Sequence, residues 1–246
     1  MEQTHIVKSF DDELKVINTT LVEMGGMAEA QLAKAVRALI TRDTDLAREA
    51  KKDDARIDLL EEELDRDAIR IIALRQPMAE DLRMVITALK TASNLERIGD
   101  YAKNIAKRAV TLSKMPPVGN TAHTIERMAE LAQGLVGNVL DAYVRRDVEA
   151  ADDVRRRDEE IDQLHTSLFR ELLTHMMEDP HNITACTHLL FIAKNIERIG
   201  DHATSIAEYV HFMVSGETPE GKRPKSDKTS KTIVTPAQGK IGRAHV

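Results

Sequence analysis

Two copies of one seven-residue sequence carry the carboxylates of this chain that are best suited to chemistry. Asn-Leu-Glu-Arg-Ile-Gly-Asp covers residues 94–100, and Asn-Ile-Glu-Arg-Ile-Gly-Asp covers residues 195–201. On a helix, each copy would place its Glu and Asp on one face, about one turn apart. Two such carboxylates repel each other, and their oxygen atoms suit hard cations such as Mg²⁺, Ca²⁺, Mn²⁺ or iron.

A second pair of acids with the same spacing precedes each signature. Asp54 and Asp58 lie upstream of the first copy, and Asp158 and Asp162 occupy the corresponding positions upstream of the second. Each half of the chain therefore carries two acid-x-x-x-acid pairs on consecutive predicted helices. Four carboxylates that converged between two helices would repel strongly unless a multivalent cation lay among them. The pattern thus suggests a metal cluster in each half.

The spacing alone does not separate a metal site from a solvated helix surface. The chain has 41 acidic residues, and pairs such as Glu49 and Asp53 show the same spacing. Apolar neighbours such as Ile98 place the signature acids beside a buried stripe, where a carboxylate needs a partner. That partner is either a cation or an arginine, for example Arg97 or Arg198, and the sequence leaves both alternatives open.

Each signature also contains a glycine, Gly99 or Gly200, in the middle of a predicted helix. Glycine at such a position costs about 1 kcal/mol relative to alanine. Its presence at the same place in both copies indicates that another helix approaches closely, which would also bring that helix within reach of the carboxylates. Tight packing without any ligand is the alternative explanation.

The prolines mark the ends of the helices that must position these acids. Pro77, the pair Pro116 and Pro117, and Pro180 all fall between segments with apolar residues at helical spacing. The expected helices cover residues 10–41, 44–75, 80–114, 121–145, 148–178 and 182–215. A possible bend at Gly25-Gly26 is the only irregularity expected in the first of them.

The predicted fold class is all-α, with two tandem three-helix-bundle repeats that are related by internal duplication and packed side by side. A single amphipathic helix pair cannot close a core, so the repeats must pack together. The predicted domains are residues 1–116, residues 117–215 and a disordered basic tail, residues 216–246. The tail has seven Lys or Arg against three Asp or Glu. It is expected to be a solvated extension or to contact lipid head groups or an acidic partner.

Composition limits the class of protein. The chain has 246 residues, a net charge of −6 and 3% aromatic residues, which fits a helical globular protein and argues against nucleic acid as the partner. Cys186 is the only cysteine and is expected to be a buried apolar residue in a reducing compartment. We find no apolar signal segment and no run of about 18 apolar residues, so the expected location is the cytoplasm.

Enzyme motifs are missing from the sequence. There is no P-loop, Gly-rich dinucleotide turn, nucleophile elbow or zinc-type Cys/His spacing. The Glu-x-x-His pairs of di-iron bundles are also missing, and His202, which follows the second signature, is expected to lie at the surface or behind a ligand. The prediction is therefore no enzyme and no catalytic residue. A carboxylate-bridged metalloenzyme, such as a hydrolase, and a purely structural interaction bundle remain as alternatives.

The chain resembles the PhoU family of phosphate-signalling regulators over about residues 5–214. The resemblance rests on Met24-Gly-Gly-Met27, Arg75-Gln-Pro77, Asp81-Leu-Arg83 and the two Glu-Arg-Ile-Gly-Asp signatures. It implies that the family's acid-x-x-x-Asp metal motif is present in pairs in both repeats. The implied metal ligands are Asp54, Asp58, Glu96, Asp100, Asp158, Asp162, Glu197 and Asp201.

The resemblance also implies a function. PhoU proteins are adaptors and negative regulators of phosphate homeostasis, and they link the phosphate ABC transporter to the sensor histidine kinase of the phosphate response. The expected partners are that kinase, the transporter ATPase and a second copy of the chain in a homodimer. The expected cofactors are divalent or iron ions (Fe, Mn, Mg or Zn) on the carboxylate clusters. A cytoplasmic protein would then meet the inner membrane only through its partners.

Overall fold

The computed structural model describes residues 2–219 and 225–232 of the chain, with side chains from residue 10 onward except residue 11. The described residues form helices and no strand. The six long helices are α1 (Glu2–Thr41), α2 (Thr44–Arg75), α3 (Glu80–Leu112), α4 (Thr121–Arg145), α5 (Val148–Glu178) and α6 (Ile183–Ser215). Two short 3₁₀ helices, η1 (Pro180–Asn182) and η2 (Thr229–Lys231), complete the set. The all-α prediction is confirmed.

Most helix ends lie where the sequence predicts them. The bounds of α2, α4 and α5 agree with the predicted ranges, and those of α3 and α6 differ by one or two residues at one end. Helix α1 begins at Glu2 rather than at Phe10, because no Gly or Pro stands before Phe10 to end it. It also continues without interruption through Gly25 and Gly26.

The two repeats use the same turn before their second helix. Arg42 and Arg146 adopt left-handed backbone conformations, with φ of 58° and 54°. The next residue in each case is an aspartate that caps a helix: Asp43 accepts hydrogen bonds from the first turn of α2, and Asp147 accepts one from the backbone N–H of Ala150. The Arg-Asp sequence that both repeats share thus has the same backbone geometry in each, which extends the duplication beyond the signatures.

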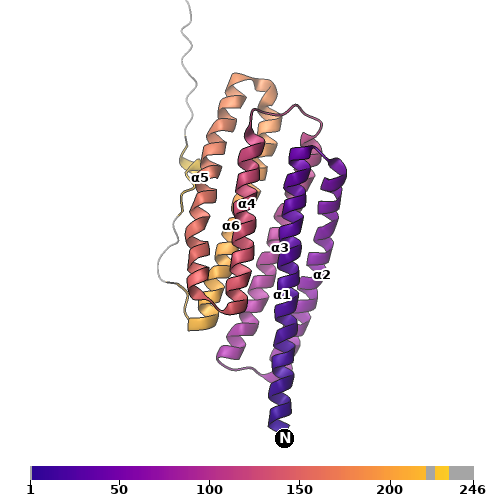
Figure 1. Ribbon diagram of the computed structural model, residues 1–246, viewed down its shortest axis with the longest axis vertical. Coiled ribbons are helices and arrows are strands. Elements are labelled where there is room, and N and C mark those ends of the chain that lie inside the picture. Colours follow the sequence, from indigo (N-terminus) through magenta and orange to yellow (C-terminus); the bar gives the residue numbers. More distant parts are fainter. Residues whose placement is uncertain (1, 220–224, 233–246) are drawn as a thin grey trace, which may run out of the picture.

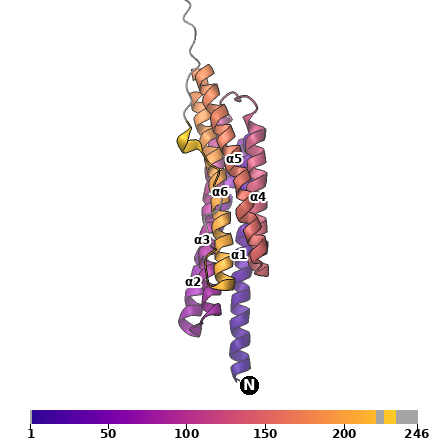
Figure 2. The same ribbon diagram turned by 90° about the vertical axis from the view of Figure 1, so that its left-hand side faces the viewer.

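The helices form two three-helix bundles that lie side by side, with α1, α2 and α3 in one and α4, α5 and α6 in the other (Figure 1). Helix α3 packs against α1, α2 and α6, and α6 packs against α4, α5 and α3. Helix α1 also packs against α4, so both bundles share one elongated core (Figure 2). The two signatures lie on α3 and α6, the central pair of helices.

Apolar side chains from all six helices fill the core. Those that are fully or almost fully buried include Leu21, Leu64, Ile98, Met128, Leu168 and Ile199. The thiol of Cys186 is buried, as the sequence predicts, and burial raises its pKa. No helix among the described residues is long and apolar enough to span a membrane.

Candidate functional site

The signatures face the helices that carry the second pairs of acids. Helix α3 packs against α2, and α6 packs against α5. In both signatures the isoleucine and the glycine are buried, whereas the arginine, Arg97 or Arg198, is exposed. This rotation places the signature acids at the margin of the buried stripe, facing the second helix of the same repeat. The expectation that the acid-bearing helices face each other at these positions agrees with the structure.

In the first repeat, one lysine joins acids from both helices. The ammonium of Lys103 contacts Asp54 Oδ2 on α2 and lies 2.6 Å from Asp100 Oδ1 on its own helix. The guanidinium of Arg97 adds weaker contacts, 3.4 Å from Asp100 and 3.5 Å from Glu96. Burial would raise the pKa of Asp100, but the hydrogen bond and charge of Lys103 hold it below its ordinary value.

Glu96 is the acid of this first cluster whose charged form is most disfavoured by its surroundings. Burial, and next the negative charge of Asp100, raise the pKa of Glu96 to about 7. Asp58 is exposed overall, but its carboxyl is partly shielded from solvent. This partial burial, and next the charge of Asp54, raise the pKa of Asp58. The four predicted acids of the first repeat therefore lie close enough to influence one another, and Lys103 supplies much of the opposing charge.

Gln31 of α1 is a neighbour of this cluster that the sequence pattern did not reveal. It is fully buried, and its amide nitrogen donates to Ala50 O at 3.0 Å and to Asp54 Oδ1 at 3.5 Å. Its carbonyl oxygen accepts no hydrogen bond among the described residues. Gln31 thus helps to orient the carboxylate of Asp54 from helix α1. The sequence signal that could have revealed this contact is a polar residue beside the apolar stripe of α1.

In the second repeat, three of the four predicted acids are buried: Asp158, Asp162 and Glu197. Lys194 lies 2.8 Å from Glu197 Oε1, while the other oxygen of Glu197 is buried and accepts no hydrogen bond among the described residues. Asp201 lies half-buried, with its Oδ1 atom 3.4 Å from the ammonium of Lys225 in the C-terminal segment. The second cluster therefore takes its positive charge from different lysines than the first.

The two signature glycines make room for α2 and α5. A Cβ at Gly99 would lie 3.0 Å from Ile57 Cδ1 and 3.7 Å from Asp54 Oδ1. At Gly200 it would lie 3.2 Å from Ile161 Cδ1 and 2.3 Å from Asp158 Oδ1. The predicted close approach of a neighbouring helix is confirmed. Side chains of that helix, including an acid, fill the space, and at Gly99 the amide oxygen of Gln31 on α1 also lies 3.2 Å from the Cβ position.

The signatures also touch each other between the repeats. His202 Nδ1 on α6 lies 2.7 Å from Asn94 Oδ1 on α3, and its ring centroid lies 5.5 Å from that of Tyr101. Burial, and next the charge of Arg97, lower the pKa of His202. His202 is half-buried rather than fully exposed, and its expected place behind a metal ligand stays a prediction. It joins the first signature to the second.

The donor chemistry of both clusters fits hard cations, since every predicted ligand offers a carboxylate. The raised pKa of Glu96 and the unbonded oxygen of Glu197 fit an added positive charge. However, no group of three or more His, Cys, Asp or Glu in residues 2–219 and 225–232 is arranged to hold a metal ion. In the first repeat, an entering cation would have to move the ammonium of Lys103 from between Asp54 and Asp100.

Comparison with known proteins gives a consistent result for both repeats. The model of the family described as "PhoU domain" matches residues 21–109 and 125–210. The phosphate-specific transport system accessory protein PhoU homolog of Rhizobium meliloti is 51% identical over 94% of this chain and 97% of its own. That of Caulobacter vibrioides is 51% identical over 92% of this chain and 98% of its own.

Solved structures are similar along the same length. The crystal structure of PhoU from Pseudomonas aeruginosa superposes with a TM-score of 0.82 at 38% identity, covering 85% of this chain and 100% of that one. The phosphate transport system regulatory protein PhoU from Streptococcus pneumoniae gives a TM-score of 0.79 at 27% identity, covering 86% and 99%. The two-repeat arrangement is therefore shared with proteins of known structure.

Proposed function

Because the chain belongs to the PhoU family, we propose that it is a regulatory accessory protein of a phosphate-specific transport system. The match of the family model to both repeats carries this proposal. In more detail, we propose a cytoplasmic negative regulator that binds the transporter ATPase and the phosphate-response sensor histidine kinase. The protein reaches the membrane through these partners. It acts as a homodimer and turns over no substrate, in keeping with the accessory names of its relatives.

The proposal includes metal binding by the eight acids of the two clusters. A divalent or iron ion (Mg, Mn, Fe or Zn) would neutralise the carboxylates and fix α2 against α3 and α5 against α6. Two observations support this role. Burial and the charge of Asp100 disfavour the ionised form of Glu96, and one oxygen of Glu197 accepts no hydrogen bond among the described residues, so a bound cation would stabilise both carboxylates. The surfaces of the helices away from the clusters would then serve partner binding.

One observation favours a second candidate, an interaction bundle whose acids make only ion pairs. Lys103 already bridges Asp54 and Asp100, as an internal cation would. In this alternative the clusters stabilise the helix pairs without metal, and the adaptor function rests on the outer surface alone. A carboxylate-bridged hydrolase remains the enzyme alternative, and no specific observation favours it.

Capture of partners from membranes tests the adaptor proposal. The tagged full chain is incubated with solubilised membranes of phosphate-replete cells, and bound proteins are identified by mass spectrometry. We expect the transporter ATPase and the sensor kinase to be enriched over a tag-only control. Recovery of neither protein would refute the adaptor role. Light scattering on the same preparation tests the homodimer.

Metal content tests the cluster proposal separately. The purified chain should carry near-stoichiometric metal by elemental analysis, and Asp100→Asn combined with Asp201→Asn should lose it. The matched control changes Asp141 and Asp153 to Asn, because these acids are 72% and 51% exposed and lie outside both clusters. Equal metal content in both double variants would exclude the proposed ligands and favour the ion-paired bundle.

A further inference from the structure

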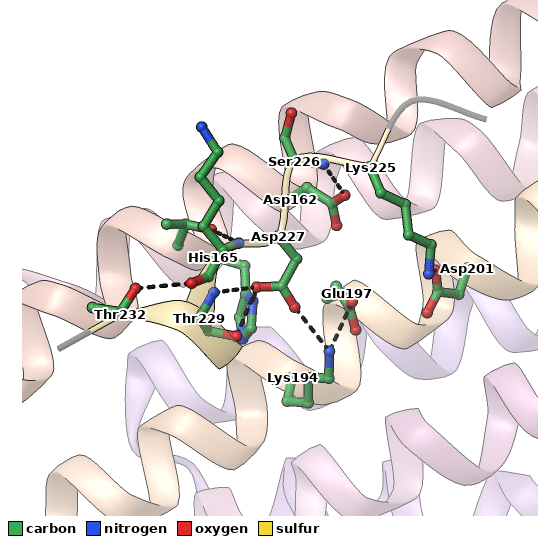
Figure 3. Close-up of polar contacts among 12 residues, drawn as sticks. Asp162, His165, Lys194, Glu197, Asp201, Lys225, Ser226, Asp227, Thr229 and Thr232 are labelled. Carbon is green, nitrogen blue, oxygen red and sulfur yellow. Dashed lines mark hydrogen bonds and ion pairs between the residues drawn. The ribbon is translucent and has the colours of Figure 1, made fainter. Parts of the chain in front are cut away.

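The C-terminal segment 225–232, which the sequence places in a disordered tail, lies against the second carboxylate cluster (Figure 3). The backbone N–H of Ser226 donates to Asp162 Oδ2 at 2.9 Å, and the Ser226 hydroxyl lies 2.6 Å from Glu159 Oε1. Two residues later, the N–H of Lys228 donates to Thr166 Oγ1 at 3.2 Å. The segment thus follows α5 and makes backbone hydrogen bonds with side chains of that helix.

Asp227 fixes the segment to α6 and to the interior. Its Oδ2 atom lies 3.3 Å from Lys194 Nζ, and its Oδ1 atom lies 3.7 Å from Nδ1 of the buried His165. Oδ1 also accepts from the N–H and hydroxyl of Thr229, at 2.9 and 2.7 Å, which begins the short helix η2. Burial would raise the pKa of Asp227, but its bonds with Thr229 and Lys194 lower it to about 2, so the carboxylate is charged.

Apart from the shared acids, the residues of α5 and α6 that contact this segment differ between the repeats. The two repeats share their acid pairs, yet the first repeat has different residues at each of the other contact positions. Glu159, His165, Thr166 and Lys194 correspond to Ala55, Glu61, Glu62 and Ser93. Ala55 offers no acceptor for Ser226, and Glu61 would repel Asp227. The first repeat therefore lacks the complementary surface.

The segment also compensates for a missing lysine. In the first repeat Lys103 contacts the signature aspartate Asp100, whereas the corresponding residue of α6 is Thr204. At the second signature it is Lys225 of the tail whose ammonium lies 3.4 Å from Asp201. The burial of the acids differs accordingly: Asp162 is 1% exposed beneath the segment, while its counterpart Asp58 is exposed.

We propose that the acidic face of α5 and α6 is the binding site of the chain's own segment 225–232, which covers the second carboxylate cluster and leaves the first uncovered. The two clusters are then unequal in access. Any cation or basic partner that reaches the second cluster must displace the segment. At the first cluster it meets side chains of the helices themselves, Lys103 and the exposed Arg97. The proposal does not depend on metal binding or on phosphate signalling, because it concerns contacts within one chain.

Hydrogen exchange on the full chain, followed by mass spectrometry, tests this assignment. Peptides that contain residues 225–232 should exchange at least about tenfold more slowly than an unstructured chain of that sequence. Lys225→Gln combined with Asp227→Asn should abolish the protection, and these partly exposed tail positions cannot unfold the helices. Exchange of this segment at the unstructured rate in the unaltered protein would overturn the proposal.

A matched pair of variants tests the site on the helices. Asp162→Ala with Asp201→Ala removes the carboxylates that contact Ser226 and Lys225. Asp58→Ala with Asp100→Ala makes the same change in the first repeat. We expect loss of tail protection in the former alone, and equal effects of both pairs would refute the assigned site. Protection should also be independent of protein concentration over a hundredfold dilution. Protection that disappears on dilution would instead assign the segment to a second copy of the chain.

Discussion

A Cβ atom on Gly200 would lie 2.3 Å from Oδ1 of Asp158, so the signature backbone of α6 leaves no room beside this buried acid for any larger residue. The equivalent Cβ at Gly99 meets Ile57 at 3.0 Å, Gln31 Oε1 at 3.2 Å and Asp54 only at 3.7 Å. The shared glycine therefore serves the same purpose in both repeats, but the approach of the acid is closer in the second.

This difference predicts unequal effects of alanine at the two glycines. Gly200→Ala must move the carboxylate of Asp158, and we expect a loss of about 1–2 kcal/mol in the free energy of unfolding. At Gly99 the small shifts of Ile57 and of the buried Gln31 amide should nearly offset the helix-propensity gain, leaving a change within about 1 kcal/mol. Urea denaturation of both variants measures these changes in the free energy of unfolding.

The control for these variants is Gly134→Ala in α4, where a Cβ would have no heavy atom within 4 Å. It should stabilise the protein by about 0.5–1 kcal/mol, because alanine restricts the unfolded chain without strain. The expected order of stability is Gly134→Ala, Gly99→Ala, Gly200→Ala. If Gly200→Ala were as stable as Gly134→Ala, the close packing of α6 on Asp158 would be incorrect.

A substitution of Lys103 gives a second test. Among the described residues of the first cluster, Lys103 is the side chain that contacts acids of both α2 and α3. Lys103→Met keeps the apolar stem and removes the ammonium, which leaves Asp54 and Asp100 facing each other without it. We expect a loss of about 1–3 kcal/mol at pH 7, which becomes smaller as acid protonates the carboxylates. Thermal or urea unfolding at several pH values measures it.

Lys107→Met is the matched control for that variant, since Lys107 is exposed on the same helix and its ammonium lies 3.5 Å from Asn104 Oδ1. Its effect should stay within about 0.5 kcal/mol. Equal stability of the two variants would mean that the acids of the first cluster do not depend on Lys103.

The helical framework could be predicted because its signals are local. Asp43 and Asp147 each follow an arginine and cap a helix, and Pro77 and Pro180 lie between helices, so the bounds follow from a few neighbouring residues. It could also be predicted that the acid-bearing helices face each other. The duplication presents the same pattern twice, and the buried isoleucine of each signature fixes how its helix is rotated about its axis.

The partners of the acids could not be predicted in the same way. Lys103 stands three residues after Asp100, but that spacing does not say that its ammonium also reaches Asp54 on another helix. The contacts of Ser226 and Asp227 depend on where the chain passes after α6, and a short polar segment has no apolar periodicity that reports its position. Long-range polar contacts depend on how the helices and the tail pack together, and the local sequence around each residue does not encode this packing.

Tyr143 of α4 tests the contact between the two repeats. Its buried hydroxyl lies 3.0 Å from Asn18 Oδ1 on α1, and burial raises its pKa. Tyr143→Phe keeps the ring and leaves the amide oxygen without this donor, so we expect a loss of about 0.5–1.5 kcal/mol in urea denaturation. Tyr209→Phe should be nearly neutral, since the contact of Tyr209 with the ammonium of Lys90 is made by its ring, which phenylalanine keeps. Equal effects would contradict the contact.

The acid dependence of stability should include a contribution from Glu13 of α1. Arg75 at the end of α2 donates to both carboxylate oxygens at 3.0 Å, and its hydrogen bonds lower the pKa of Glu13 below the ordinary 4.5. Because the folded pKa is the lower one, this stabilisation is full above pH 4.5 and is lost as the pH falls through the folded pKa. Glu13→Gln should therefore destabilise the protein at pH 7, and its difference in stability from the unaltered chain should disappear in acid.

The control for this variant is Glu23→Gln, which removes a half-exposed contact of 3.4 Å with Arg56 and should show a smaller difference. A Glu13→Gln effect that did not change between pH 7 and pH 3 would exclude this ion pair as its source.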